Sequence, residues 1–209
     1  MLDEPDKPFA WLRQGILFLL SAPSGAGKTT LSGRLFDRVP DLHPSISYTT
    51  RPPRPGEVDG QDYHFISEEQ FMRLRGAGAF AEWARVHDFL YGTARAPLDE
   101  VLSSGHDLLL DIDVQGVKQL KATYAATSVS IFVLPPSWEE LECRLRGRGT
   151  DDDEVIARRL QRAREEAHEL INYDYWVVND QVERAVAILQ GIITAERARV
   201  LRLRERTVV

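Results

Sequence analysis

A glycine-rich stretch, Ala22-Pro23-Ser24-Gly25-Ala26-Gly27-Lys28-Thr29, directly follows a short apolar run. The usual phosphate-binding signature is Gly, four residues, then Gly-Lys-Ser/Thr, and here Ala22 stands at its first position. Gly25 and Gly27 remain where the backbone must approach the phosphates most closely, and alanine at the turn adds one methyl group. A glycine-rich turn without a ligand is the alternative, but the lysine and hydroxyl at the required positions argue against it.

In such a cradle, the backbone N–H groups of the loop and the following helix N-terminus hold the β-phosphate of ATP. Lys28 is expected to reach the β- and γ-phosphate oxygens, and Thr29 to ligate Mg²⁺, partly through water. The predicted cofactor is therefore Mg²⁺, with ATP as phosphate donor. The expected ATP contacts from the loop are Ala22, Pro23, Ser24, Gly25, Ala26, Gly27, Lys28, Thr29 and Thr30.

The stretch "LLLDID", residues 108–113, places Asp111 and Asp113 at the carboxyl end of a predicted strand, where open α/β sheets have their ligand sites. One of the two could hold a magnesium-bound water, and Asp111 is the candidate metal ligand. If both still belong to the strand, they point the same way and can serve one site. The alternative for one of them is a cap on the following helix.

The elements that must position these residues are short buried strands separated by helical patterns. Such alternation predicts an α/β fold, with a parallel sheet flanked by helices. Ser137 and Glu140 have the spacing of a capping box at the start of one helix. The expected strands are Ile16–Leu20, Leu108–Ile112, Ile131–Leu134 and Tyr175–Val178.

Two segments interrupt the alternation. Residues 47–93 contain Pro and Gly followed by short alternating stretches at Tyr63–Ile66 and Phe80–Val86, which predicts a small strand-rich insertion serving as a substrate arm. Residues 137–170 are Arg-rich and suit a mobile lid, with a solvated helix pair as the alternative. The expected division is a loose leader at 1–14, in which Trp11 could pack down, a core at 15–46, 94–136 and 171–209, the arm and the lid.

Composition bounds the function class. The 209 residues fit one domain, and the formal charge of −6 argues against a general nucleic-acid binder. The single cysteine favours a reducing compartment, and the longest early apolar run is too short to span a membrane. We therefore expect a cytoplasmic protein without nucleic-acid or membrane partners, and a homo-oligomer is left open. A GTPase is disfavoured because Asn179-Asp180 lacks the lysine of the guanine-reading element.

Several motifs of independent composition occur in order along the chain. They are the cradle, "SYTTRPPRPGEVDGQDYHF" (47–65), "EWARVHDFLYGT" (82–93), "DIDVQG" (111–116) and "RLRGRG" (144–149). Together, over about residues 16–200, they resemble the guanylate kinase family, and the "SAPSGAGK" form of the cradle is similar to that of its bacterial members. The resemblance implies a P-loop NTPase-type core, a nucleotide-monophosphate-binding insertion of mixed α and β structure, and a helical lid.

The resemblance also implies the roles of individual residues. The implied holders of the GMP phosphate are Arg51, Arg54, Tyr63 and Tyr91. Those around the guanine are Ser47, Glu82, Thr93 and Asp113, with Asp111 beside them. Asn179 is implied to flank the adenine of ATP, and the lid is implied to supply Arg144, Arg148 and Arg159. The catalytic set is then Lys28, Arg51, Arg144, Arg148 and Arg159.

Physical chemistry supports this division. In an extended strand, Glu82 shares a face with Phe80, Ala84 and Val86. Burial of its charge on that face would be unfavourable unless a partner binds it. The alternative is a glutamate at a strand edge that is exposed to solvent. One carboxylate can accept hydrogen bonds from both N1–H and the exocyclic 2-amino group of guanine. Adenine instead has an acceptor at N1 and no amine at the neighbouring position 2. A site built on such hydrogen bonds rejects the analogue by roughly 10⁴–10⁵.

The acceptor needs no general base, because the second pKa of a phosphate monoester is about 6. The five histidines accordingly form no triad, and Arg146, Arg158 and Arg162 are expected to be solvated or paired with Asp151–Glu154 and Glu165–Glu166. The sequence predicts an ATP:GMP phosphotransferase that yields GDP and ADP. The alternatives are a guanylate-kinase-like protein-binding module, which would not need the Lys-Thr cradle, a sugar-phosphate kinase, and a regulatory ATPase without a second substrate.

Overall fold

The structure is a computed structural model that describes residues 11–86, 88–147, 149 and 151–205. Its centre is a five-stranded parallel sheet in the order β10-β9-β2-β8-β3. The four predicted strands all belong to this sheet, with no bound shifted by more than three residues, and the predicted fold class is confirmed. The strands are β2 (Leu17–Ser21), β3 (Leu42–Pro44), β8 (Asp107–Asp111), β9 (Ser128–Leu134) and β10 (Tyr175–Val178).

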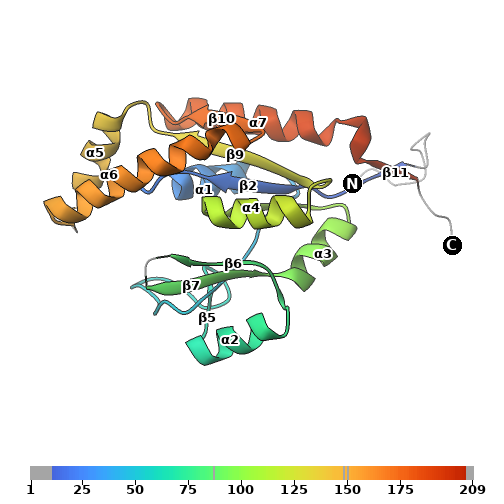
Figure 1. Cartoon of the computed structure of the whole chain (residues 1–209). Coiled ribbons are helices and arrows are strands. Elements are labelled where there is room, and N and C mark those ends of the chain that lie inside the picture. Colours follow the sequence, from blue (N-terminus) through green and yellow to red (C-terminus); the bar gives the residue numbers. More distant parts are fainter. Residues whose placement is uncertain (1–10, 87, 148, 150, 206–209) are drawn as a thin grey trace.

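Helices cover both faces of the central sheet, so every residue of β2 is buried, and all but Ser21 are apolar. Its residues alternate between two apolar clusters: Phe18 and Leu20 pack with α1 (Lys28–Arg38) and α7 (Val182–Arg197), whereas Leu17 and Leu19 pack with α3 (Arg95–Ser103) and α4 (Val114–Thr123). Figure 1 shows α7 above the sheet and α4 below it. The carboxyl end of β2, where the cradle begins, is thereby fixed from two sides.

The insertion at 47–93 is a four-stranded sheet in the order β5-β4-β7-β6, carrying one helix, and it lies below α4 in Figure 1. Its helix begins with a reciprocal capping box between Ser67 and Gln70. The predicted strand at Phe80–Val86 has those bounds, while the one at Tyr63–Ile66 is shorter. The elements are β4 (Tyr48–Thr49), β5 (His64–Phe65), α2 (Glu68–Gly76), β6 (Phe80–Val86) and β7 (Phe89–Ala94).

The segment predicted as a lid consists of α5 (Trp138–Arg146), α6 (Asp153–His168) and the short 3-10 helix η2 (Glu169–Asn172). Ser137 Oγ accepts a hydrogen bond from Glu140 N at 3.1 Å, as predicted. The Glu140 carboxylate accepts from Arg144 Nε at 2.8 Å instead of closing a reciprocal capping box, because an i,i+4 arginine lies within its reach.

Residues 1–10 of the predicted leader lie outside the described residues, and the part that follows them is not loose. Its residues Trp11–Arg13 form β1, which pairs antiparallel with β11 (Leu203–Glu205) after the 3-10 helix η3 (Val200–Arg202). Buried Asp107 binds both Arg13 and Arg197, and so ties this ribbon to β8 and α7. A loose segment was expected because charges and prolines dominate it, and the partner strand lies about 190 residues away in the sequence. The side chain of Trp11 lies outside the described residues.

Within the described residues, every helix is too short or too polar to cross a lipid bilayer.

Candidate functional site

The predicted cradle lies between β2 and α1. Gly25 and Gly27 both have φ of 95°, a left-handed conformation that glycine adopts without strain. A Cβ on Gly27 would lie 2.4 Å from Nδ2 of Asn179, and that amide donates to Ala26 O at 2.8 Å. Asn179, predicted to flank adenine, therefore supports the loop from behind in this structure.

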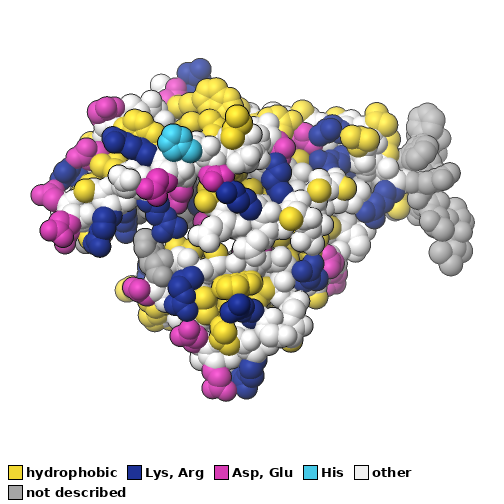
Figure 2. Space-filling model, viewed as in Figure 1, with side chains coloured by type: hydrophobic (Ala, Val, Ile, Leu, Met, Phe, Trp, Pro, Cys, Tyr) yellow, Lys and Arg dark blue, Asp and Glu magenta, His cyan; other side chains and the backbone are white. Residues whose placement is uncertain are grey.

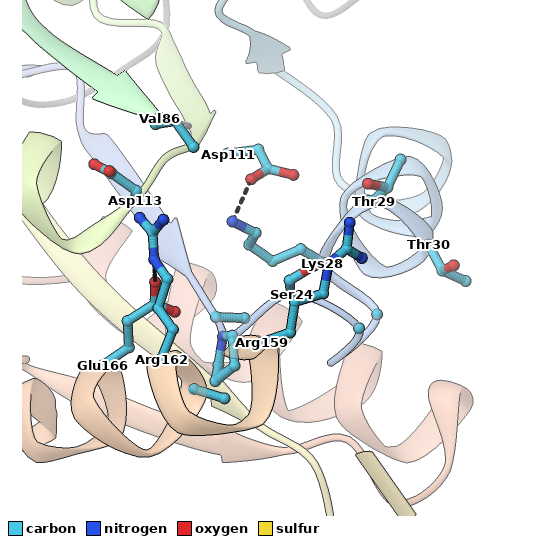
Figure 3. A pocket seen from close by; sticks show the side chains of 15 residues that line it. Ser24, Lys28, Thr29, Thr30, Val86, Asp111, Asp113, Arg159, Arg162 and Glu166 are labelled. Carbon is cyan, nitrogen blue, oxygen red and sulfur yellow. Dashed lines mark hydrogen bonds and ion pairs between the residues drawn. The ribbon is translucent and has the colours of Figure 1, made fainter. Parts of the chain in front are cut away.

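A cavity of about 360 Å³ opens over the cradle (Figure 3). Lys28 Nζ lies within it, 2.7 Å from Asp111 Oδ1. The predicted loop contacts line this cavity, apart from Ala26, which is buried beneath it. The lining residues are Ala22, Pro23, Ser24, Gly25, Gly27, Lys28, Thr29, Thr30, Val86, Asp111, Asp113, Arg159, Arg162, Ala163 and Glu166.

The lid segment contributes arginines from α6. Arg159 lines the cavity as predicted, and its Nη1 lies 3.1 Å from Asp151 Oδ2. Arg144 is turned elsewhere, donating to Glu140 and to the carbonyl oxygen of Asn179 at 3.1 Å. Arg148 lies outside the described residues.

Sequence reasoning missed the position of Arg162 and Glu166. Their predicted pairing is confirmed, with 3.0 Å between Arg162 Nε and Glu166 Oε1, but both side chains also point into the cavity (Figure 3). Burial raises the pKa of Glu166 above its usual value. The signal was present, because Arg159, Arg162 and Glu166 follow at intervals of three and four on one face of α6.

A second cavity of about 210 Å³ adjoins the first and shares Lys28, Val86, Asp111 and Asp113 with it. It is enclosed between β6 and β7 of the arm and the carboxyl end of β8. Two nearby chambers that share a lysine suit a reaction between two phosphorylated molecules. The lining residues of the second cavity are Lys28, Ser47, Tyr63, Glu82, Ala84, Val86, Tyr91, Asp111, Ile112 and Asp113.

Glu82 is buried at the inner end of this second cavity, with 5% of its surface exposed, so the exposed-edge alternative is wrong. Thr93 Oγ1 donates to Glu82 Oε1 at 2.6 Å, and Ser47 Oγ lies 3.3 Å from the same threonine hydroxyl. Burial raises the pKa of Glu82 to about 7, and the charge of Asp113 adds to the rise. Among the described residues, Thr93 supplies the one side-chain hydrogen bond that the Glu82 carboxylate accepts.

The two aspartates do not share a strand face, because β8 ends at Asp111. Asp113 instead caps α4, with Oδ1 accepting from Gly116 N at 2.9 Å. Its Oδ2 is buried and has no hydrogen-bond partner among the described residues. Both aspartates nevertheless line both cavities, and so the capping alternative and the shared site are both realised.

The predicted phosphate holders differ in how the structure places them. Arg51 is buried and binds Glu57 through two nitrogens at 2.9 and 2.8 Å, with its guanidinium 5.5 Å from the Tyr63 ring. Tyr63 and Tyr91 have ring centroids 5.9 Å apart, and burial raises the pKa of Tyr63 to about 12. Arg54 is exposed and does not line the cavity. Glu57, which holds Arg51 in place, was missed because a carboxylate in a Pro-Gly turn reads as solvated.

Comparison with known proteins agrees with this geometry. A family model described as guanylate kinase matches residues 14–196. The chain belongs to the guanylate kinase family. It is 58% identical to guanylate kinase of Syntrophotalea carbinolica over 192 residues, covering 92% of this chain and 91% of that one. It is 53% identical to guanylate kinase of Geobacter sulfurreducens, covering 91% and 94% respectively.

A crystal structure of guanylate kinase from Anaplasma phagocytophilum matches with a TM-score of 0.79 and 33% identity, covering 92% of each chain. The predicted family resemblance is therefore confirmed. Phosphoryl transfer from ATP to GMP is the function of guanylate kinases, and the predicted class of enzyme, a nucleoside monophosphate kinase, is confirmed with it. The roles of individual residues stay predictions.

Proposed function

We propose that this chain transfers the γ-phosphate of ATP to GMP through the two adjoining cavities, with the residues assigned above. The observation that carries the assignment is that Lys28, in the cradle, also lines the cavity in which Glu82 is buried. A donor phosphate held by the cradle and a GMP phosphate held near Tyr63 and Tyr91 would then meet beside Lys28. Such proximity is the main requirement of phosphoryl transfer.

Guanine would bind in the inner part of the second cavity. Its N1–H and exocyclic amine would donate to the Glu82 carboxylate, which accepts only one side-chain hydrogen bond, from Thr93, among the described residues. Ser47 and Asp113 would complete the surroundings. Adenine would leave the buried carboxylate without these donors, so AMP is expected to be a very poor acceptor.

The transfer itself needs little from protein side chains beyond alignment and charge neutralisation. The attacking atom is a GMP phosphate oxygen that is ionised at neutral pH and requires no base. Lys28 and Arg159 would neutralise charge on the transferred group, together with Arg144 and Arg148 if lid closure brings them in. Arg51, released in part from Glu57, would bind the GMP phosphate with Arg54, Tyr63 and Tyr91.

The site also fits Mg²⁺. Thr29 and Asp111 offer a hydroxyl and a carboxylate at one cavity, and oxygen ligands of this kind suit a hard cation that takes its remaining ligands from phosphates and water. Among the described residues, no group of three His, Cys, Asp or Glu side chains is arranged to hold a metal. Bound Mg²⁺ would supply positive charge to the ATP phosphates.

The functional units and the setting belong to this proposal. The arm at 47–93 would bind GMP, the lid at 137–170 would cover ATP, and the remaining segments would form the core. A cytoplasmic location and the lack of a nucleic-acid partner are supported by the single cysteine and the net charge of −6. On the face seen in Figure 2, Lys and Arg are interspersed with Asp and Glu, without a broad basic surface.

The direct test is a coupled assay of ADP release from Mg-ATP with GMP, AMP, CMP and UMP, each alone and at matched concentration. We expect turnover with GMP and very little with the other three. Equal turnover with AMP would contradict the guanine assignment of Glu82. A protein that binds GMP but releases no ADP would instead be a binding module of guanylate kinase fold.

A further inference from the structure

Helix α4 lies between the central sheet and strand β6 of the arm (Figure 1). Its cap and first two turns carry Asp113, Gly116 and Gln119 at intervals of three, which places them along one side of the helix. That side faces β6, the strand that carries Glu82. The two carboxylates of the second cavity therefore come from two elements that meet along this line.

Gln119 joins the two elements directly. Its Nε2 donates to Trp83 O at 2.8 Å, and its Oε1 accepts from Trp83 N at 3.2 Å. A primary amide offers one acceptor and adjacent donors, so it can pair with a strand residue as a neighbouring strand would. Since β6 is at the edge of its sheet, Gln119 occupies a position open to such pairing and fixes the residue next to Glu82.

Gly116 controls how closely the elements approach. A Cβ on Gly116 would lie 2.9 Å from Glu82 Oε2 and 2.4 Å from Ile112 Cδ1, distances shorter than side chains tolerate. The same residue donates its N–H to Asp113 Oδ1 at 2.9 Å. Gly116 therefore leaves room for the Glu82 carboxylate beside α4, and its N–H group orients the Asp113 carboxylate.

Helix α4 is itself fixed to the core through Lys121. The ammonium group donates to Ser130 Oγ at 3.0 Å, to Asn172 O at 2.9 Å and to the Asp174 carboxylate at 3.2 Å. Because this end of the helix is tied to β9 and to the segment before β10, Gln119 connects the arm to a fixed support.

We propose that Gln119 is a positioning residue for guanine recognition, holding β6 at the register that lets Glu82 and Asp113 read the base together. This inference rests on the proposed function and deepens it. The feature to be read is the exocyclic 2-amino group, because IMP has the same N1–H, O6, ribose and phosphate as GMP but lacks that amine. Two carboxylates in a fixed relation discriminate against its absence, whereas loosely held ones do so less.

The test is Gln119→Met, which keeps the length and helix propensity of the side chain but removes both hydrogen bonds to Trp83. The ratio of kcat/KM for GMP to that for IMP is expected to fall about tenfold, through a higher KM for GMP. The KM for ATP should stay within about twofold. The matched control is Lys118→Met, which also introduces methionine, one residue earlier on α4. It removes an exposed ion pair with Glu169 and should leave the ratio unchanged.

A second pair of variants tests the contact between α4 and β6 at Gly116. Ile112→Ala removes the side chain that a new Cβ would strike first, and adding Gly116→Ala in that background leaves the contact with Glu82 as the main obstruction. The double variant should show a lower GMP to IMP ratio than Ile112→Ala alone. This comparison decides the matter if Gln119→Met does not fold.

The outcomes separate this inference from the function on which it rests. Wild-type protein that phosphorylates neither GMP nor IMP would refute both. Wild-type activity with GMP, together with variants that lose GMP and IMP turnover by the same factor, would overturn the role of Gln119 alone and make it a packing residue. A selective loss for GMP, with ATP unaffected, supports it.

Discussion

The cradle and the second cavity, which is the proposed guanine pocket, are built in opposite ways. The cradle consists of consecutive residues 22–30, and the groups proposed to bind phosphate are mainly backbone N–H groups on a loop in which Gly25 and Gly27 have positive φ. The guanine pocket is assembled from side chains at positions between 47 and 113, on different elements of two sheets. A backbone site tolerates a changed residue such as Ala22, whereas a side-chain site depends on the identity and register of each group.

The two regions also differ in electrostatics. In the cradle, Lys28 is already paired with Asp111 and can exchange that partner for phosphate. In the second cavity, burial and the nearby charge of Asp113 raise the pKa of Glu82, and Oδ2 of Asp113 is buried without a hydrogen-bond partner among the described residues. Under the proposed function, the N1–H and 2-amino groups of guanine would supply hydrogen bonds to these carboxylates.

The largest expected effect comes from Lys28, the one basic residue among those that the two cavities share. Lys28→Met should lower kcat by about 10³-fold, because the ammonium group would neutralise charge that develops on the transferred phosphoryl group. GMP affinity, measured by calorimetry, should change little, since the proposed guanine contacts of Ser47, Glu82 and Asp113 remain. Turnover at the wild-type rate would contradict the catalytic role of Lys28.

A smaller and more selective effect is expected in the guanine pocket. Glu82→Gln should reduce kcat/KM for GMP by about 10²-fold, because an amide cannot accept from both guanine donors without presenting its own NH₂ group. The KM for ATP should be unaffected. Equal losses for both nucleotides would make Glu82 a structural residue.

The pH dependence sharpens this prediction. Burial raises the pKa of Glu82 from its ordinary value of 4.5 to about 7. The contribution of this group to folding stability is therefore present below pH 4.5 and is lost as the pH rises toward 7. GMP affinity should change in the opposite direction, with a KM about tenfold higher at pH 6 than at pH 8, because guanine binds the ionised form. The GMP phosphate titrates in the same range. Glu82→Gln is the control, and only the phosphate contribution should persist in it.

The smallest expected effect tests the backbone site. Gly27→Ala should raise the KM for ATP by about tenfold or more and leave GMP binding unchanged, since the new methyl meets Asn179 at a positive φ. Gly33→Ala is the matched control in the following helix, where a Cβ meets nothing within 4 Å. It should raise the free energy of unfolding by about 1 kcal/mol and leave both KM values unchanged. A Gly27→Ala enzyme with normal ATP kinetics would argue against the cradle assignment.

Sequence reasoning succeeded where the signal is local. The cradle, the central strands and β6 follow from apolar runs and glycine spacing within a few residues, and their assignments needed no tertiary contact. The burial of Glu82 was also predictable, because its neighbours on the same strand face are apolar and belong in the interior. A charge at such a position is unfavourable unless a partner binds it.

Features made by distant contacts were not predictable in this way. Strand β3 has three residues, one of them buried, and β1 becomes a strand only through its pairing with β11. Likewise, Gln119 reads as an ordinary helix residue until β6 is placed beside it. Arg162 was expected to be solvated or paired with an acidic group, and it pairs with Glu166, but its place at a cavity was not predicted, since the direction of α6 is set by packing.

The arm and the central sheet have different apolar clusters, and this affects how cooperatively the chain unfolds. Phe71, Phe80 and Leu90 form a cluster within the arm, distinct from those on the two faces of the central sheet. Opening of the arm would therefore expose its own cluster, whereas in the core clusters it would remove only the packing of Ala81, a residue of β6, against the α3 and α4 side of the sheet. Backbone amides of β7 should accordingly exchange with deuterium through local opening, at a lower free energy than those of β2, which exchange only when the whole chain unfolds.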